Sequence, residues 1–167
     1  MSRIQSVDHV AIALPSIEAA LPLFVDVFGC EYVAGGDDER LGIRTIQLTL
    51  GQTKVELMQP LGEDSYLQRY LDRHGPGFHH LTVFVADLRD AIDALEGRGF
   101  EVVDTNFEPP WRETYIRPRS AFGTLIQVVE VDETYDPAGA EPTLADAVTG
   151  RSVWVNARPA LRAEGLS

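Results

Sequence analysis

HVAIAL, residues 9–14, overlies HLTVFV, residues 80–85, when the sequence is shifted along itself by 71 positions. The same shift lays TKVE at residues 53–56 over TLIQ at residues 124–127. Each half therefore carries a histidine near its start and, after 46 further residues, a carboxylate or carboxamide side chain. A duplicated unit that keeps ligand-type residues at matching places predicts one composite site between the two halves.

Each copy begins with a strand and continues into a helix. Residues 7–14 and 78–85 alternate between two kinds of side chain, which is typical of a strand with two distinct faces. Ser16 and Asp87 are suitable helix N-caps, and apolar residues at helical spacing follow both. Pro22 interrupts the first helix at a cost of about 3 kcal/mol, so we expect a kink or a short first turn there.

Three strand-like runs follow each helix, so the order β-α-β-β-β occurs twice. The runs are residues 31–33, 43–50 and 53–58 in the first copy, and 101–103, 113–117 and 124–131 in the second. We predict an α+β fold in which two tandem modules form a curved eight-stranded mixed sheet, with a metal site in its cleft. One domain spans residues 1–167: module one at 5–60, a connecting helix within 61–77, module two at 78–132 and a tail at 133–167. The tail is expected to fold back on the body or on a partner subunit.

Composition limits the partners. A net charge of −12 argues against nucleic acid and anionic membranes, which need a basic face. The single Cys30 cannot form an internal disulfide and fits a reducing compartment. No signal peptide and no apolar run of membrane-spanning length is evident, so we expect a cytoplasmic protein.

Four side chains are candidate metal ligands. His9 and His80 face away from the helix-packing residues of their strands, and alternation puts Glu56 and Gln127 on the corresponding faces. Two imidazoles, a carboxylate and an amide oxygen suit Mn, Co, Ni, Fe or Zn, and spacing does not choose among these ions. Taken singly, each residue is more often structural or solvated than a ligand, but the repeat favours the metal site. His79 falls on the opposite face from His80 and is interpreted as a packing or supporting residue.

These residues resemble the vicinal oxygen chelate superfamily, and four segments resemble its methylmalonyl-CoA epimerases. The segments are VDHVAIALP at 7–15, VELMQPLGEDS at 55–65, GFHHL at 77–81, and RPRS at 117–120 followed by GTLIQ at 123–127. The resemblance implies a divalent metal held by His9, Glu56, His80 and residue 127. It also implies a small-molecule substrate, an acyl-CoA, whose two neighbouring oxygens the metal chelates so that an enolate is stabilised. We also expect a homodimer.

The chain departs from the epimerase pattern at positions that the resemblance associates with proton transfer. The last ligand of the epimerases is commonly Glu, whereas Gln127 cannot act as a base. Residues 43–50 lack the second carboxylate of some relatives, and Pro109-Pro110-Trp111 replaces a glycine-rich run. Glu113 and Glu56 are therefore the candidate catalytic residues, although a solvated role for Glu113 is an equal alternative. The candidate substrate-binding residues, which could equally be surface groups, are Arg112, Tyr115, Arg117 and Arg119.

Three function classes remain open from the sequence. The first is a metal-dependent isomerase or epimerase acting beside a carbonyl by enolate stabilisation, which the local matches favour. The second is a glyoxalase-like lyase or a non-haem iron dioxygenase, because His9, Glu56 and His80 match a two-His-one-carboxylate triad if Gln127 stays unbound. The third is a non-catalytic small-molecule-binding protein, whose known examples typically lack this ligand set. Fold alone does not decide among them.

Overall fold

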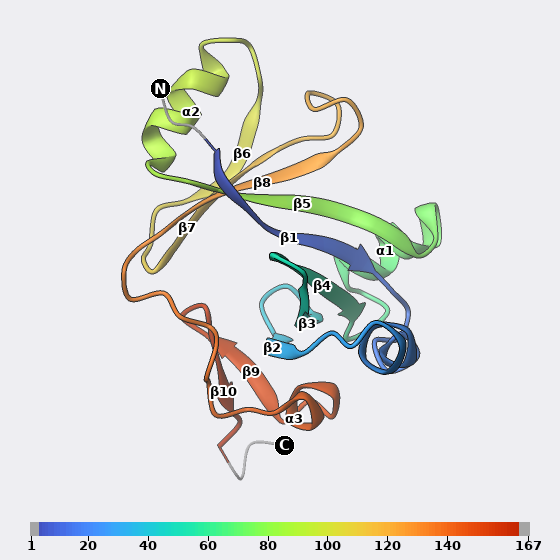
Figure 1. Ribbon diagram of the computed structural model, residues 1–167. Coiled ribbons are helices and arrows are strands. Elements are labelled where there is room, and N and C mark those ends of the chain that lie inside the picture. Colours follow the sequence, from blue (N-terminus) through green and yellow to red (C-terminus); the bar gives the residue numbers. More distant parts are fainter. Residues whose placement is uncertain (1–3, 164–167) are drawn as a thin grey trace. The chain divides into compact units, whose positions relative to one another are not determined.

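The computed structural model describes residues 4–163 and contains both expected modules (Figure 1). Module one comprises β1 (Ile4–Ala13), the π-helix η1 (Pro22–Val27), β2 (Tyr32–Asp38), β3 (Ile43–Leu50) and β4 (Thr53–Pro60). After α1 (Tyr66–His74), module two comprises β5 (Gly77–Val85), α2 (Leu88–Glu96), β6 (Val102–Asn106), β7 (Trp111–Ile116) and β8 (Leu125–Val131). The tail adds α3 (Leu144–Val148), β9 (Ser152–Val155) and β10 (Arg158–Leu161). The predicted α+β class and mixed pairing are confirmed, but the described residues hold ten strands rather than eight.

Two compact units divide the chain differently from the sequence repeat. Unit 1 contains β1 as far as Ala11 together with residues 79–135. Unit 2 contains residues 12–78 and the chain from Asp136 onward. The first strand of module one therefore belongs to the same unit as module two, so neither module forms a unit by itself.

Unit 1 is a sheet with α2 over one face. Its strands follow the order β1-β5-β8-β7-β6, with β5 parallel to β8 and the β8–β7 and β7–β6 pairs antiparallel. Val83, Val128 and Ile116 pack against Leu88 and Ala91 of α2 in one apolar cluster. Because strand side chains alternate, the residues between them on β5, β7 and β8 lie on the opposite face. That opposite face carries His80 and Gln127, as the sequence predicted.

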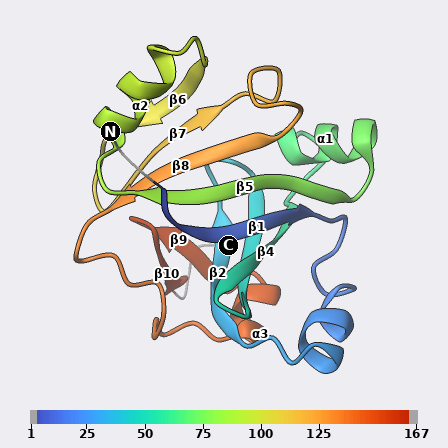
Figure 2. The same cartoon turned by 45° about the horizontal axis from the view of Figure 1, so that its top comes forward.

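Unit 2 combines β2, β3 and β4 with the tail. Its strands follow the order β10-β9-β2-β3-β4, in which β9 runs parallel to β2 and the other pairs are antiparallel (Figure 2). Ile46, Leu48, Val55 and Leu57 form the core together with Ala147 of α3. Glu56 pairs with Gln47 across β3 and β4 and lies on the face opposite this core. The tail thus folds back on the body, and its two short strands extend the sheet.

The first helix differs from the expectation that it would start after Ser16. The Ser16 hydroxyl accepts a hydrogen bond from the backbone N–H of Ala19 at 3.3 Å, but only turns follow before η1. The helix begins with Pro22 in its first turn, where the missing N–H leaves no intrahelical bond unmade. The connecting helix agrees with the sequence, since Ser65 caps α1 and Leu67 and Leu71 are its buried residues. Among the helices within residues 4–163, none is long and apolar enough to cross a membrane.

Candidate metal centre and its carboxylate

Two buried histidines meet on neighbouring strands of unit 1. His9 on β1 and His80 on β5 are 2% and 6% exposed, and their Nε2 atoms lie 3.2 Å apart. Two nitrogens that each lie about 2.1 Å from one ion are about 3.0 to 3.4 Å apart in octahedral or tetrahedral geometry. Two imidazole nitrogens at this separation also need a shared proton or cation between their lone pairs. The pair therefore fits a divalent metal without rearrangement.

The Nδ1 atoms of both histidines are engaged on the other side of each ring. His9 Nδ1 lies 2.6 Å from Oδ2 of buried Asp8, and His80 Nδ1 lies 2.8 Å from His79 Nδ1. A carboxylate on Nδ1 fixes the ring orientation of a metal-binding histidine and raises its basicity. Burial, reinforced by repulsion from His9 and His79, holds the pKa of His80 well below its ordinary value. His80 is therefore neutral at physiological pH, which is the form that binds a metal.

Thr82 connects the histidines to Gln127. Its hydroxyl donates to Gln127 Oε1 at 2.6 Å and lies 2.9 Å from His9 Nε2. Thr82 is fully buried on the His80 face of β5, and Gln127 lies beside it on β8. The Thr82 hydroxyl thus lies between the amide oxygen of Gln127 and the imidazole of His9 and contacts both.

The amide nitrogen of Gln127 reaches the carboxylate of Glu113 on β7. Gln127 Nε2 donates to Glu113 Oε2 at 2.5 Å and to the Tyr115 hydroxyl at 2.9 Å. Glu113 Oε2 also accepts from the Tyr115 hydroxyl at 3.2 Å and from the Trp111 indole N–H at 2.9 Å. All three donors meet at Oε2, and within the described residues Oε1 accepts no hydrogen bond. Such a carboxylate is fixed in orientation by one oxygen and retains the other for proton transfer.

Glu56 lies in unit 2, on β4. It is 8% exposed, and Oε1 accepts a hydrogen bond from Gln47 Nε2 at 3.1 Å. Lys54 Nζ donates in turn to Gln47 Oε1 at 3.1 Å. A buried polar group is stable when such hydrogen bonds satisfy it. Glu56 is thus a positioned oxygen donor on the face that the sequence predicted.

The arginines proposed for substrate binding lie elsewhere. Arg112 is on the face of β7 opposite Glu113, where Nη1 donates to Glu130 Oε1 at 3.2 Å. Arg119 forms a solvent-exposed ion pair with Glu101, and Arg117 is exposed just beyond the end of β7. Of the four candidates, the structure brings only Tyr115 to the carboxylate of Glu113.

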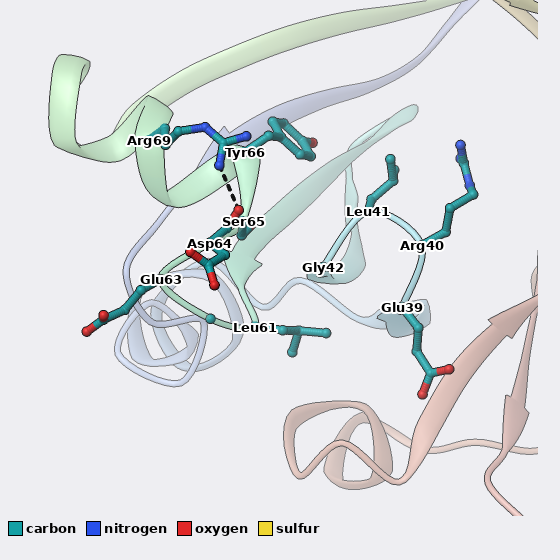
Figure 3. Close-up of a pocket in the computed structure, with 11 residues that line it drawn as sticks. Glu39, Arg40, Leu41, Gly42, Leu61, Glu63, Asp64, Ser65, Tyr66 and Arg69 are labelled. Carbon is teal, nitrogen blue, oxygen red and sulfur yellow. Dashed lines mark hydrogen bonds between the residues drawn. The ribbon is translucent and has the colours of Figure 1, made fainter.

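A separate surface pocket of about 560 Å³ lies in unit 2 (Figure 3). Two arginines and three acidic residues line it, so it has no cationic character; they are Glu39, Arg40, Glu63, Asp64 and Arg69. Tyr66 forms part of the wall, and burial, followed by the charges of Glu56 and Asp38, raises its pKa above the ordinary value. Tyr66 is therefore a neutral phenol whose surroundings include the carboxylate of Glu56.

Sequence reasoning missed several side chains of these networks, including Trp111 beside Glu113 and Gln47 beside Glu56. Asp8 precedes His9 on a strand, where alternation places it on the other face, so only the fold shows that its carboxylate reaches Nδ1. Thr82 lies two residues after His80, and this spacing could have identified it. Trp154 comes from the tail, and its indole N–H donates to Thr45 Oγ1 at 2.8 Å.

The fold and this set of side chains define the class of the protein. The chain belongs to the glyoxalase/bleomycin resistance protein/dioxygenase superfamily, whose signature matches residues 8–116. Its relatives include the ethylmalonyl-CoA/methylmalonyl-CoA epimerase of Cereibacter sphaeroides, 33% identical over 130 residues that cover 74% of this chain and 96% of the relative. The mitochondrial methylmalonyl-CoA epimerase of Dictyostelium discoideum is 27% identical over 76% of this chain and 79% of its own. The crystal structure of methylmalonyl-CoA epimerase from Mycobacterium tuberculosis matches with a TM-score of 0.70 and 30% identity, covering 77% of this chain and 89% of that one.

Proposed function

We propose that this protein is a divalent-metal-dependent epimerase of a 2-substituted malonyl thioester such as methylmalonyl-CoA. Its similarity to acyl-CoA epimerases supports the reaction class. The observation that carries the proposal is the hydrogen bond between Gln127 and Glu113 at 2.5 Å. Through this bond, a residue expected to bind the metal contacts the carboxylate of Glu113. That carboxylate can act as a base, which the amide of Gln127 cannot.

The proposed ligands are His9, His80 and Glu56, with the amide oxygen of Gln127 as the weakest. The donor set of two imidazoles, a carboxylate and an amide suits Co, Mn, Ni, Zn or Fe. When bound, such an ion would polarise the substrate's carbonyl oxygens and make the adjacent C–H more acidic. Elemental analysis of protein purified without chelators identifies the metal. An H80A variant is expected to lose stoichiometric binding while remaining folded.

Glu113 is the proposed general base. Its Oε1 takes the α-proton, the C–H bonding pair forms a C=C bond to the thioester carbon, the carbonyl π pair moves onto the thioester oxygen, and an enolate results. Trp111, Tyr115 and Gln127 hold Oε2 throughout, so the carboxylate need not reorient during the transfer. Epimerisation is completed when a proton is delivered to the opposite face of the enolate.

Glu56 is the second carboxyl group available for that delivery: it would enter the turnover protonated and leave it ionised, while Glu113 does the reverse. The variant E56Q separates its two roles, because glutamine retains an oxygen donor for the metal but carries no acidic proton. Retained metal with lost epimerisation would assign Glu56 to proton transfer. Lost metal would assign it to the ligand set.

Exchange of the α-hydrogen of methylmalonyl-CoA with deuterated solvent tests the proposal. Enolate formation requires this exchange, so mass spectrometry should detect deuterium uptake that depends on a divalent metal. The variant Q127E places a carboxylate where epimerases commonly have one, and we expect it to retain or raise the rate. Metal-loaded protein that binds methylmalonyl-CoA without exchange would exclude the epimerase. The homodimer expected from the sequence stays a prediction, which sedimentation analysis tests.

A non-haem iron dioxygenase is the second candidate. The observation that favours it is that Gln127 Oε1 accepts a hydrogen bond from Thr82, which leaves His9, His80 and Glu56 as the stronger donors. Two histidines and one carboxylate with open positions are the ligand composition of such oxygenases. Oxygen consumption by the Fe(II)-loaded protein in the presence of catechols, without α-hydrogen exchange on acyl-CoA, would select this function.

A further inference from the structure

Within unit 2, the tail packs against Gly35 and Gly36, two neighbouring glycines of β2. The Ser152 hydroxyl, fully buried, donates to the carbonyl oxygen of Gly35 at 2.6 Å. A Cβ on Gly36 would lie 2.9 Å from Ser152 Oγ and 3.0 Å from the backbone N of Val153. Real side-chain atoms essentially never approach so closely, so β9 can pair with β2 only because residue 36 has no side chain. Figure 2 shows β9 beside β2.

A hydrogen bond from β3 and an ion pair with β2 fasten the segment from the end of α3 to Arg162. Arg44 Nη1 donates to the carbonyl oxygen of Val148 at the end of α3 at 2.5 Å. Arg162, after β10, binds the carboxylate of Asp37 at 3.0 Å. The segment between these contacts is therefore fixed to β2 and β3.

This docking places Trp154 on the face of β3 that carries the Glu56 network. The indole N–H donates to Thr45 Oγ1, and Thr45 lies two residues before Gln47 on the same face. Two residues along a strand span about 7 Å, and diagonal neighbours on paired strands are about 7 to 8 Å apart. The half-buried indole is thus bound to the face of β3 that also carries Gln47, the hydrogen-bond partner of Glu56.

We propose that Trp154 is a specificity-determining residue that limits the size of the α-substituent on the acyl thioester. The inference rests on the proposed function, because it takes Glu56 as a metal ligand that fixes the substrate's oxygens. With those oxygens fixed, the substituent on the α-carbon is the part of the acyl group within reach of the indole. The family signature ends at residue 116, so this wall comes from a part of the chain outside the match.

The indole is suited to exclusion because contacts hold both its ring and its backbone. Its N–H is bound to Thr45, and its backbone lies in a strand held by Ser152 and the paired β10. A rigid apolar wall discriminates between substrates that differ by one methylene by about 10- to 200-fold. Ethylmalonyl-CoA and methylmalonyl-CoA differ by one methylene and form the appropriate pair of probes.

The test compares deuterium uptake into the two thioesters by wild type, W154A and V155A. We expect W154A to raise the ethylmalonyl-to-methylmalonyl ratio of kcat/KM by about tenfold or more. V155A is the matched control, because Val155 is exposed and alternates to the other face of β9. T45V, which removes the acceptor but leaves the indole, should shift the ratio in the same direction by less. An unchanged ratio in W154A, with circular dichroism showing a folded protein, would overturn the proposal.

A binding readout separates this inference from the proposed reaction. The chain has two tryptophans, so the difference between the emission of wild type and that of W154F reports Trp154. We expect methylmalonyl-CoA to shift this difference in metal-loaded protein, whereas coenzyme A alone should not. If wild type exchanges no hydrogen but this shift occurs, the epimerase fails and the role of Trp154 in contacting the acyl group stands. If exchange occurs without any shift, the role of Trp154 falls and the epimerase stands.

Discussion

Replacement of Glu113 by glutamine is expected to abolish most of the α-hydrogen exchange while leaving the fold and the metal in place. The side chain keeps its shape, and its amide oxygen can still accept from Trp111, Tyr115 and Gln127 at the position of Oε2. The amide nitrogen then occupies the place of Oε1 and has no lone pair for a proton. A positioned general base contributes about 10²- to 10⁴-fold, which corresponds to about 3 to 5 kcal/mol of activation free energy.

The stability cost of the same change should be much smaller. Hydrogen bonds to charged groups contribute about 1.5 to 3 kcal/mol and those between neutral groups about 0.5 to 1.5 kcal/mol. Because Glu113 is only partly buried, three weakened bonds should lower the free energy of unfolding by about 1 to 2 kcal/mol in total. Urea unfolding and metal analysis measure stability and occupancy beside the mass-spectrometric exchange assay.

E130Q is the matched control for this experiment. Glu130 lies on the helix-facing side of β8, where it binds the backbone N–H of Leu88 and Arg112 rather than Gln127. We expect E130Q to lose some stability and to retain the exchange rate of the wild type. Exchange by E113Q at the wild-type rate, with metal bound, would refute Glu113 as the base.

Three further changes test other parts of the structure. D8N should weaken metal affinity by about 10- to 100-fold, because the carboxylate that orients His9 is lost, and titration against a metal indicator dye measures this. G36V should destabilise the protein by about 1 to 3 kcal/mol in urea unfolding, since the new side chain collides with Ser152. The Thr143 hydroxyl and backbone N–H hold the pKa of Asp146 below its usual value of about 3.9, so its stabilisation is present above that pH and is lost as pH falls through the folded value. D146N should therefore be less stable than wild type at pH 7, and thermal unfolding should show the difference shrinking below about pH 4.

The repeat made the strands and the histidine pair predictable. A shift of 71 positions superimposes His9 on His80, and in the structure these two side chains are in contact across that separation. The strand-like run predicted at residues 43–50 also coincides with β3 at Ile43–Leu50. Such signals are local and survive in a single sequence.

The rest depended on contacts that no local pattern records. The first helix starts at Pro22 rather than after Ser16, since proline is tolerated in a first turn and not in a helix interior. The strands β9 and β10 have four residues each, too few to show a period, and β9 pairs with a strand more than a hundred residues away. The role of Gln127 as a donor to Glu113 required the register of β7 on β8, which the sequence did not supply.

Because β1 belongs to unit 1, the folding of this unit during translation depends on strands that are synthesised much later. A ribosome releases β1 before the other strands of unit 1, of which the last, β8, ends at Val131. The sheet of unit 1 therefore cannot close until β8 has been translated. Folding of unit 1 is controlled by contacts between distant parts of the chain, which are slow to form. A cut between the modules would separate β1 from the other strands of unit 1. The contact between His9 and His80 should therefore form only when both fragments are present together.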